Sequence, residues 1–182
     1  MLLKTSVCNF GWKAEDFNLK SVDEKFYDLN SIKGINGTLI MFICNHCPYV
    51  KAIKDKIAYE SKALKNIGIN TAAIMSNDTL QYPEDSFENM KVFSDSNNFD
   101  FPYLFDESQE IAKKYDAVCT PDFYGFNNNL ELQYRGRLDS KGKNSNTTNV
   151  KRELFDAMTI IAKSGKGPKE QHASMGCSIK WR

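Results

Sequence analysis

The sequence of 182 residues lacks an excess of charge of either sign, because 24 Lys and Arg stand against 23 Asp and Glu. A general nucleic-acid binder usually carries a basic excess, so this balance argues against that class. No apolar run reaches the length that crosses a membrane. The N-terminus also lacks the basic and apolar segments of a secretory signal. These absences predict a cytoplasmic protein without nucleic-acid or membrane partners.

Internal repeats, low-complexity blocks and a clear interdomain linker are also missing. The sequence therefore predicts one domain over residues 1–165, followed by a C-terminal tail over residues 166–182 that contains Cys177. The tail has no clear periodicity, so we expect it either to lie over the domain or to be mobile. The lack of a second large domain argues against a nicotinamide or flavin site, and we expect no cofactor.

The five cysteines are an odd number, so they cannot all pair within one chain. A chain of this length buries a sizeable core without disulfides. In a reducing compartment a CxxC motif is more often catalytic or metal-binding than structural. Cys44 and Cys47 form such a motif, with Asn45 and His46 between them and Pro48 directly after.

The local pattern places this motif between a strand and a helix. Residues 37–43 form a continuous apolar run that predicts a strand buried on both faces. Residues 48–68 predict a helix, with Pro48 suited to its first turn. Residues 69–75 predict a second buried strand, so the three segments form a right-handed βαβ unit. The CxxC motif thus falls at the carboxyl end of a strand and the amino end of a helix.

The flanking segments predict two hairpins and further helices. The first hairpin covers residues 16–29. The second joins residues 119–126 to residues 130–137 through three asparagines that suit a tight turn. Helices are expected within residues 83–95, within residues 106–117 and at residues 150–165.

Thiol chemistry follows from the position of the CxxC motif. Exchange requires a thiolate as attacker and a second thiol that closes the ring. The free N–H groups of a helix amino terminus stabilise a thiolate. We expect this thiolate at Cys44, the more exposed cysteine. Such surroundings lower the pKa of a cysteine to about 3.5–7.5. Cys47 would resolve the mixed disulfide, and His46 would add a cation. Each of these residues also has an interpretation without chemistry. Cys44 and Cys47 could be small buried residues without a role, His46 could be a surface histidine, and Pro48 could serve only to begin the helix.

Thr120 and Pro121 supply a second clue. A proline at the start of a strand is allowed at an edge or in a cis turn. An ordinary trans turn is the alternative that the sequence leaves open.

These features together resemble the thioredoxin fold, and more closely the peroxiredoxin-like AhpC/TSA or redoxin domain proteins of the thioredoxin family. Residues 13–19, KAEDFNL, are similar to an opening of the type APDF.L, with Glu15 in place of proline. The other matching stretches are MFICNHCPYVKAI, SNDTLQYPEDSFENM, FPYLFDESQEIAKKYDAVCTPDFY, YRGRLD and SMGCSIKW. The resemblance implies an α/β thioredoxin-like fold with an N-terminal hairpin extension, a central mixed sheet flanked by helices, and a C-terminal tail.

The resemblance also assigns roles to the candidate residues. Cys44 matches the first, nucleophilic cysteine of thioredoxin and Cys47 matches the second. Thr120 and Pro121 match the cis-proline loop, which packs against the dithiol and presents backbone to a bound peptide. We therefore expect a thiol-disulfide oxidoreductase, with a disulfide-bearing protein or a small thiol or peroxide as substrate and a thioredoxin-like electron donor. The sequence indicates no oligomeric state.

A thiol-dependent peroxidase is the second hypothesis. The peroxiredoxin pattern PxxxTxxC puts its peroxidatic cysteine at Cys47, but Cys44 stands in the threonine place and Ile40 in the proline place. The hydroxyl that would hold a peroxide oxygen is therefore missing. Arg135 or Arg137 could supply the arginine of a peroxide-binding site. Alternatively, both could lie at a solvated strand end.

The remaining cysteines leave several alternatives open. Cys119 could approach the dithiol, and Cys177 resembles the resolving cysteine of some peroxiredoxins, but each could equally be a bystander. Cys8 has no assigned role. Cys44, Cys47, His46 and Cys177 could instead bind a soft metal such as Cu(I) or Zn. A zinc finger requires a second close ligand pair, which His172 and Cys177 are too loosely placed to form, so we expect no metal. The last alternative is a catalytically silent interaction domain.

Overall fold

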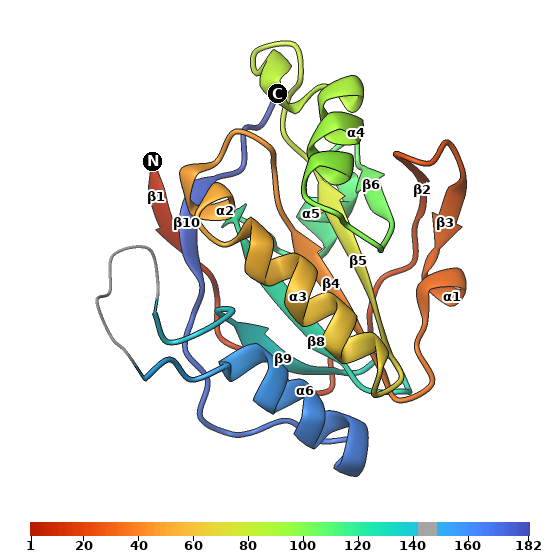
Figure 1. Cartoon of the computed structure of the whole chain (residues 1–182), viewed down its shortest axis with the longest axis vertical. Helices are drawn as coiled ribbons and strands as arrows, with labels where there is room; N and C mark the ends of the chain where they lie inside the picture. Colours follow the sequence, from red (N-terminus) through yellow and green to blue (C-terminus); the bar gives the residue numbers. More distant parts are fainter. Residues whose placement is uncertain (142–148) are drawn as a thin grey trace.

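A seven-stranded mixed sheet runs through the centre of the molecule in the order β3-β2-β6-β5-β4-β8-β9 (Figure 1). The computed structural model describes residues 1–141 and 149–182. The strands are β2 (Asn18–Ser21), β3 (Phe26–Asp28), β4 (Gly37–Phe42), β5 (Ile69–Met75), β6 (Tyr103–Phe105), β8 (Asp122–Phe126) and β9 (Leu132–Gly136). The predicted mixed sheet and both predicted hairpins, β2-β3 and β8-β9, are confirmed.

The centre of this sheet is buried on both faces. Strand β4 pairs in parallel with β5 and antiparallel with β8, and all six of its residues are buried. Leu39 and Met41 pack into the core on one face, whereas Ile40 and Phe42 pack into the core on the other. Successive side chains of a strand point to opposite faces, so the continuous apolar run predicted from the sequence fits a central strand.

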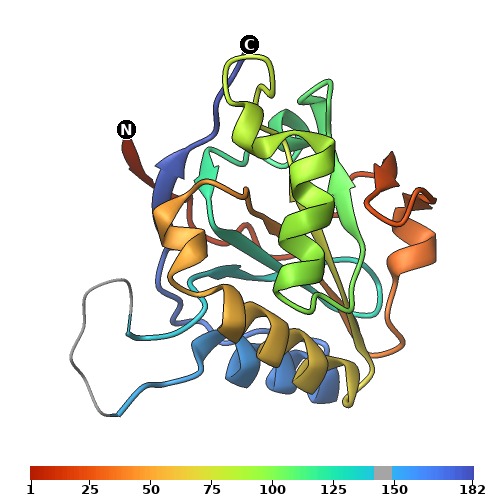
Figure 2. The same cartoon turned by 45° about the horizontal axis from the view of Figure 1, so that its top comes forward.

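Helices cover the sheet and carry the motif. They are α1 (Leu29–Ile32), α2 (Pro48–Lys51), α3 (Lys54–Lys65), α4 (Phe87–Ser96), α5 (Glu110–Lys114) and α6 (Glu153–Ser164), with a 3₁₀ turn η1 (Pro83–Asp85) before α4. Helices α3 and α6 contact each other and lie side by side (Figures 1 and 2). In the described ranges, no helix combines the length and apolar character of a membrane crossing.

The single helix predicted over residues 48–68 is interrupted. Helix α2 ends after Lys51, and Ile53 leaves the helical region with φ −123° and ψ 4° before α3 begins. Helix α3 then ends at Lys65, and Gly68 turns the chain into β5 with a φ of +79°, a conformation that glycine adopts without strain. The motif is therefore followed by a short separate helix.

The C-terminal segment is part of a second sheet. Strand β10 (Met175–Ser178) lies between β1 (Leu2–Lys4) and β7 (Cys119–Thr120), antiparallel to both. Of the two states expected for residues 166–182, the structure has the segment laid over the domain. Gln109 helps to hold its end, because its side-chain amide donates to the carbonyl oxygens of Ser76 and Lys180. The Gln109 side chain therefore makes no cap hydrogen bond to its own helix α5.

Candidate active site at the Cys44–Cys47 motif

The two cysteines of the motif lie where strand β4 gives way to helix α2. Cys47 is the N-cap residue of α2, and Pro48 is the first residue of the helix. Both side chains are closed off from solvent, with Cys44 1% exposed and Cys47 0% exposed. The sequence predicted Cys44 to be the more exposed of the two, but the structure buries both almost equally. A reaction at this dithiol needs either a conformational opening or a third group that reaches it.

Thr120 contacts both sulfur atoms. Its Oγ1 lies 3.3 Å from the Sγ of Cys44, and its carbonyl oxygen lies 3.3 Å from the Sγ of Cys47, which donates to it only when the thiol is protonated. The peptide bond between Thr120 and Pro121 is cis, which is one of the two forms that the sequence left open. The Oγ of Ser174 donates to the carbonyl oxygen of Pro121 at 2.6 Å. The cis-proline segment is thus fixed against the dithiol on one side and the C-terminal segment on the other.

The hydrogen-bond donors of the site converge on Cys47. The Cys44 thiol and the backbone N–H groups of Val50 and Cys177 lower the pKa of Cys47 to about 4, although burial opposes this. The same Cys44–Cys47 hydrogen bond, burial and the charge of Asp85 raise the pKa of Cys44 well above its usual range. The sequence predicted the stabilised thiolate at Cys44. The surroundings favour Cys47 instead, because the Cys44 thiol and the N–H groups of Val50 and Cys177 lower the pKa of Cys47, whereas the pKa of Cys44 is raised.

A buried carboxylate that the sequence did not single out holds the motif from the other side. Asp85 is 0% exposed, and its Oδ1 accepts from the backbone N–H groups of Asn45 at 2.8 Å and His46 at 3.2 Å. Its Oδ2 lies 2.6 Å from the Nδ1 of His46 and accepts from the amide of Asn77 at 2.8 Å. Burial alone would raise the pKa of Asp85, but the hydrogen bonds from His46 and Asn77 hold it below its ordinary value. Asp85 in turn raises the pKa of His46.

The remaining side chains of the motif are equally restrained. The ring of His46 stacks on that of Tyr82, with centroids 5.5 Å apart. The hydroxyl of Tyr103 donates to the Oδ1 of Asn45 at 2.9 Å, and the Asn45 amide donates to the carbonyl oxygen of Glu84. The loop between β4 and α2 is therefore held by hydrogen bonds at both of its central residues.

The two arginines considered for peroxide binding are engaged elsewhere. Arg135 is 5% exposed, so it does not lie at a solvated strand end. It forms an ion pair with Asp122 at 3.0 Å, and Arg137 forms one with Glu153 at 2.6 Å. Each guanidinium group is thus committed to a carboxylate of its own.

The other three cysteines differ in their relation to the dithiol. Cys177, on β10, is half-buried, packs against the core cluster that contains Cys44 and Cys47, and lies opposite Thr120 in the pairing of β10 with β7. Cys119 lies next to Thr120 on β7, where burial raises its pKa to about 12. Cys8 lies near Arg135 and Gln171, and burial raises its pKa to about 11. The structure therefore brings Cys177 to the dithiol and gives Cys8 surroundings of its own.

The residues with metal-ligand spacing differ from the set considered from the sequence. Cys44, His46 and Asp85 have ligand atoms within 4.8 Å of one another. However, both oxygens of Asp85 already accept two hydrogen bonds each. His172 lies apart from this cluster, 3.2 Å from Glu153. The carboxylate therefore fits the role of a hydrogen-bond acceptor for the motif better than that of a metal ligand.

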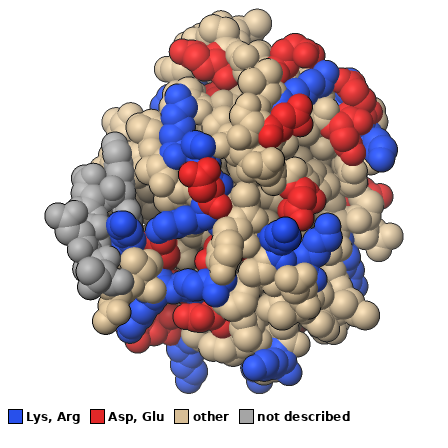
Figure 3. Space-filling view, in the orientation of Figure 1, with Lys and Arg blue, Asp and Glu red and all other residues tan. Residues whose placement is uncertain are grey.

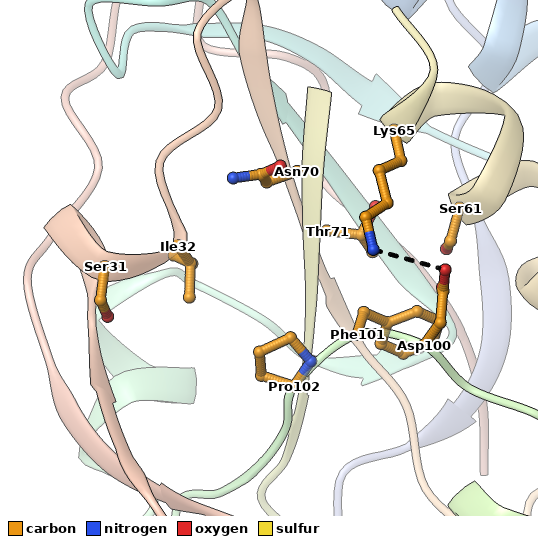
Figure 4. Close-up of a pocket in the computed structure, with 9 residues that line it drawn as sticks. All are labelled: Ser31, Ile32, Ser61, Lys65, Asn70, Thr71, Asp100, Phe101 and Pro102. Atoms are coloured by element: carbon orange, nitrogen blue, oxygen red, sulfur yellow. Dashed lines mark ion pairs between the residues drawn. The ribbon is translucent and has the colours of Figure 1, made fainter. Parts of the chain in front are cut away.

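Of two pockets in the structure, one lies beside the motif and the other contains none of its residues. A recess of about 370 Å³ opens beside the motif, lined by Asn45, His46 and residues of the α4 region such as Phe93. A smaller pocket of about 130 Å³ is lined by residues from α1, from β5 and from the segment before β6 (Figure 4). Lys65 and Asp100, which also line it, form an ion pair. None of the lining residues of this smaller pocket is a cysteine or a histidine, so it carries no thiol chemistry.

Comparison with known proteins identifies the family. Residues 10–143 match the AhpC/TSA family. The chain belongs to the AhpC/TSA family. Among solved structures, this AhpC/TSA protein is similar to an uncharacterized conserved protein from Geobacillus kaustophilus, with 40% identity, a TM-score of 0.95, and coverage of 100% of this chain and 97% of the other. A hypothetical protein from Sinorhizobium meliloti 1021 is 32% identical, with a TM-score of 0.92 and 98% of each chain covered.

A more distant likeness names the fold. The thioredoxin domain of a thiol-disulfide oxidoreductase from Bacteroides vulgatus superimposes with a TM-score of 0.59 at 13% identity, over 69% of this chain and 86% of the other. The AhpC/TSA protein therefore has the thioredoxin fold, as its motifs predicted. No curated protein matches the chain.

Proposed function

We propose that this AhpC/TSA protein is a thiol-disulfide oxidoreductase whose redox pair is Cys44 and Cys47. The observation that carries the proposal is that Thr120 contacts both cysteine sulfurs at 3.3 Å, with Cys47 at the N-terminus of helix α2. Two cysteines in that arrangement supply both requirements of disulfide exchange, namely a stabilised thiolate and a second thiol within reach of it.

The reaction then follows from the positions of the two sulfur atoms. A disulfide forms between Cys47 and the sulfur that it attacks, and the bond broken in that disulfide releases a thiolate. Cys44 loses its proton and attacks the Cys47 sulfur, which forms the Cys44–Cys47 bond and releases the second thiolate. Two electrons pass from the cysteine pair to the substrate. The sequence assigned the first attack to Cys44, but the donors around Cys47 favour Cys47 for that step in the reduced protein.

The neighbouring residues support this chemistry in different ways. Thr120 offers its hydroxyl to Cys44, and Pro121 fixes the backbone beside both sulfurs. Pro48 begins the helix whose N–H groups face Cys47. His46, paired with Asp85, keeps a cation close to the negatively charged Cys47, and the charge of Cys47 in turn raises the pKa of His46. We include a thioredoxin-like donor as the partner that reduces the pair after each turnover.

A thiol-dependent peroxidase remains the second candidate, because Cys47 has a lowered pKa at the peroxidatic position. Against it, Cys44 replaces the threonine of the peroxiredoxin pattern, and Arg135 and Arg137 are held in other ion pairs.

The surface is compatible with a protein or small-molecule substrate, since acidic and basic side chains intermingle over the face shown in Figure 3.

Disulfide mapping by mass spectrometry separates the two functions. The reduced protein is treated with one equivalent of either hydrogen peroxide or oxidised glutathione, and the rate of thiol loss is followed. The oxidoreductase predicts a Cys44–Cys47 disulfide that forms readily with oxidised glutathione and slowly with peroxide. Rapid oxidation of Cys47 by peroxide alone would favour the peroxidase, and the absence of any bond to Cys44 or Cys47 would contradict both.

A further inference from the structure

The proposed redox pair is buried, yet one thiol in contact with it is not. Cys44 and Cys47 are 1% and 0% exposed, whereas Cys177 is half-buried. Cys177 packs against the core cluster that contains both Cys44 and Cys47. It also lies opposite Thr120, whose carbonyl oxygen is 3.3 Å from the Cys47 sulfur. A chain of three thiols therefore leads from Cys44 through Cys47 to the surface at Cys177.

The strand that carries Cys177 is held closely against the cis-proline segment. Cys177 lies directly opposite Thr120 in the pairing of β10 with β7, and opposite Leu2 in the pairing of β10 with β1. A Cβ atom at Gly176 would lie 1.9 Å from the carbonyl oxygen of Thr120, so glycine at this position lets the strands approach. β10 thus occupies the free edge of β7, where an extended substrate peptide would otherwise add as a strand.

We propose that Cys177 is the exchange thiol through which the buried Cys44–Cys47 pair reacts with thiols and disulfides too large to reach it. This inference rests on the proposed oxidoreductase function and names the residue that meets the substrate.

Each step exchanges one disulfide for another. With oxidised glutathione, Cys177 loses its proton to solvent and its thiolate forms a bond to one glutathione sulfur, while the glutathione disulfide breaks to release glutathione thiolate. The Cys47 thiolate attacks the Cys177 sulfur, which forms a Cys47–Cys177 disulfide and releases the second glutathione. Cys44 gives up its proton and attacks Cys47, which forms the Cys44–Cys47 disulfide and returns Cys177 as a thiolate that takes up the proton. Two cysteine thiols are oxidised and one glutathione disulfide is reduced.

The same steps run in reverse when the protein is reduced. A thiolate from the donor attacks the Cys177 sulfur of the Cys47–Cys177 disulfide, because this is the accessible sulfur of the bond. Cys47 then departs as the leaving group, and a thiol with a low pKa leaves faster than one with a high pKa. The lowered pKa of Cys47 and the raised pKa of Cys177 therefore favour attack at Cys177.

The test compares the reaction with oxidised glutathione in the wild-type protein, Cys177→Ser, Cys177→Ala and Cys8→Ser. Cys8 is the matched control, because it is also half-buried but has no contact with the dithiol among its interactions. We expect Cys177→Ser and Cys177→Ala to slow formation of the Cys44–Cys47 disulfide by roughly tenfold or more, and Cys8→Ser to react at the wild-type rate. Circular dichroism of each variant confirms that it is folded.

A trapping experiment identifies the first sulfur attacked. Cys47→Ser cannot pass the disulfide inward, so glutathione should remain on Cys177. Glutathione on Cys44, or wild-type rates in both Cys177 variants, would overturn the exchange role while leaving the oxidoreductase intact. If the wild-type protein forms no Cys44–Cys47 disulfide with any oxidant, the proposed function itself fails and the exchange role falls with it.

Discussion

The carboxylate of Asp85 lies 2.6 Å from the imidazole of His46, although the two residues are 39 positions apart in the sequence. The same carboxylate accepts the backbone N–H groups of Asn45 and His46. One buried side chain therefore fixes the conformation of the loop between the two cysteines and sets the charge of the histidine within it.

Replacing Asp85 by asparagine should loosen this arrangement. The amide keeps the shape of the carboxylate but loses its charge and one acceptor, so at least one buried donor of the loop is left unpaired, at a cost of about 1–3 kcal/mol in the free energy of unfolding. The pKa of His46 should also fall toward its ordinary value. Urea unfolding and NMR titration of the imidazole measure the two effects. Glu88→Gln, on the exposed side of α4, is the matched control and should change neither. An unchanged His46 titration in Asp85→Asn would contradict the assigned contact.

The pair of His46 and Asp85 should also make stability depend on pH. Because Asp85 raises the pKa of His46 above the unfolded value of 6.5, the pair stabilises the fold fully below that pH, as long as Asp85 stays ionised. The stabilisation is lost as the pH rises through the higher folded pKa. The difference in free energy of unfolding between wild type and His46→Gln should therefore shrink as the pH rises above the unfolded pKa of 6.5. His172→Gln removes the other histidine as a control. A difference that grows with pH would refute the pairing.

The reduced protein should hold one thiolate in the motif at neutral pH, and it should be Cys47. We expect the ultraviolet thiolate absorbance to persist well below pH 7 and to disappear in Cys47→Ser, because the pKa of Cys47 is lowered to about 4. In Cys44→Ser the absorbance should titrate at a higher pH, yet still below the ordinary cysteine value of 9.0, since the N–H groups of Val50 and Cys177 remain. Absorbance that survives in Cys47→Ser and vanishes in Cys44→Ser would restore the assignment made from the sequence.

Gly176 should control the approach of Cys177 to Cys47. In a Cys44→Ser background, mild oxidation should yield a Cys47–Cys177 disulfide, and adding Gly176→Ala should lower its yield because the new Cβ would collide with the carbonyl oxygen of Thr120. Gly165→Ala is the control, since Gly165 has a φ of +72° and open space around it. That substitution should cost about 1–2 kcal/mol of backbone strain and leave the disulfide yield unchanged. Equal yields in the two alanine variants would show that β10 tolerates displacement.

The parts of the fold that sequence patterns predicted are those in which neighbouring residues determine the structure. The apolar run of β4, the two hairpins and helix α6 follow from periodicity and turn residues. The break between α2 and α3 at Ile53 was not predicted, because no glycine or proline marks it. The pairing of β10 with β1 and β7 was also missed, since a four-residue strand without alternation gives no local signal.

The candidate site shows the same division. The sequence supplied Cys44, Cys47 and His46 from one motif, and Thr120 and Pro121 from a resemblance. It gave no indication of Asp85, which is one acidic residue among many until the fold brings η1 to the motif. It also placed the thiolate on Cys44, because the sequence does not show which of the two sulfurs the thiol and N–H donors of the folded protein favour. The positions of backbone donors in three dimensions decided both points.

The pairing of β1 with β10 has a consequence for the order of events during synthesis. The dithiol environment is completed only when residues 175–178 have left the ribosome and docked between β1 and β7. Until then, Cys47 lacks the backbone N–H of Cys177 and the cover that β10 provides. A chain synthesised only as far as β7 therefore presents the CxxC motif without the N–H donor and the cover that β10 supplies.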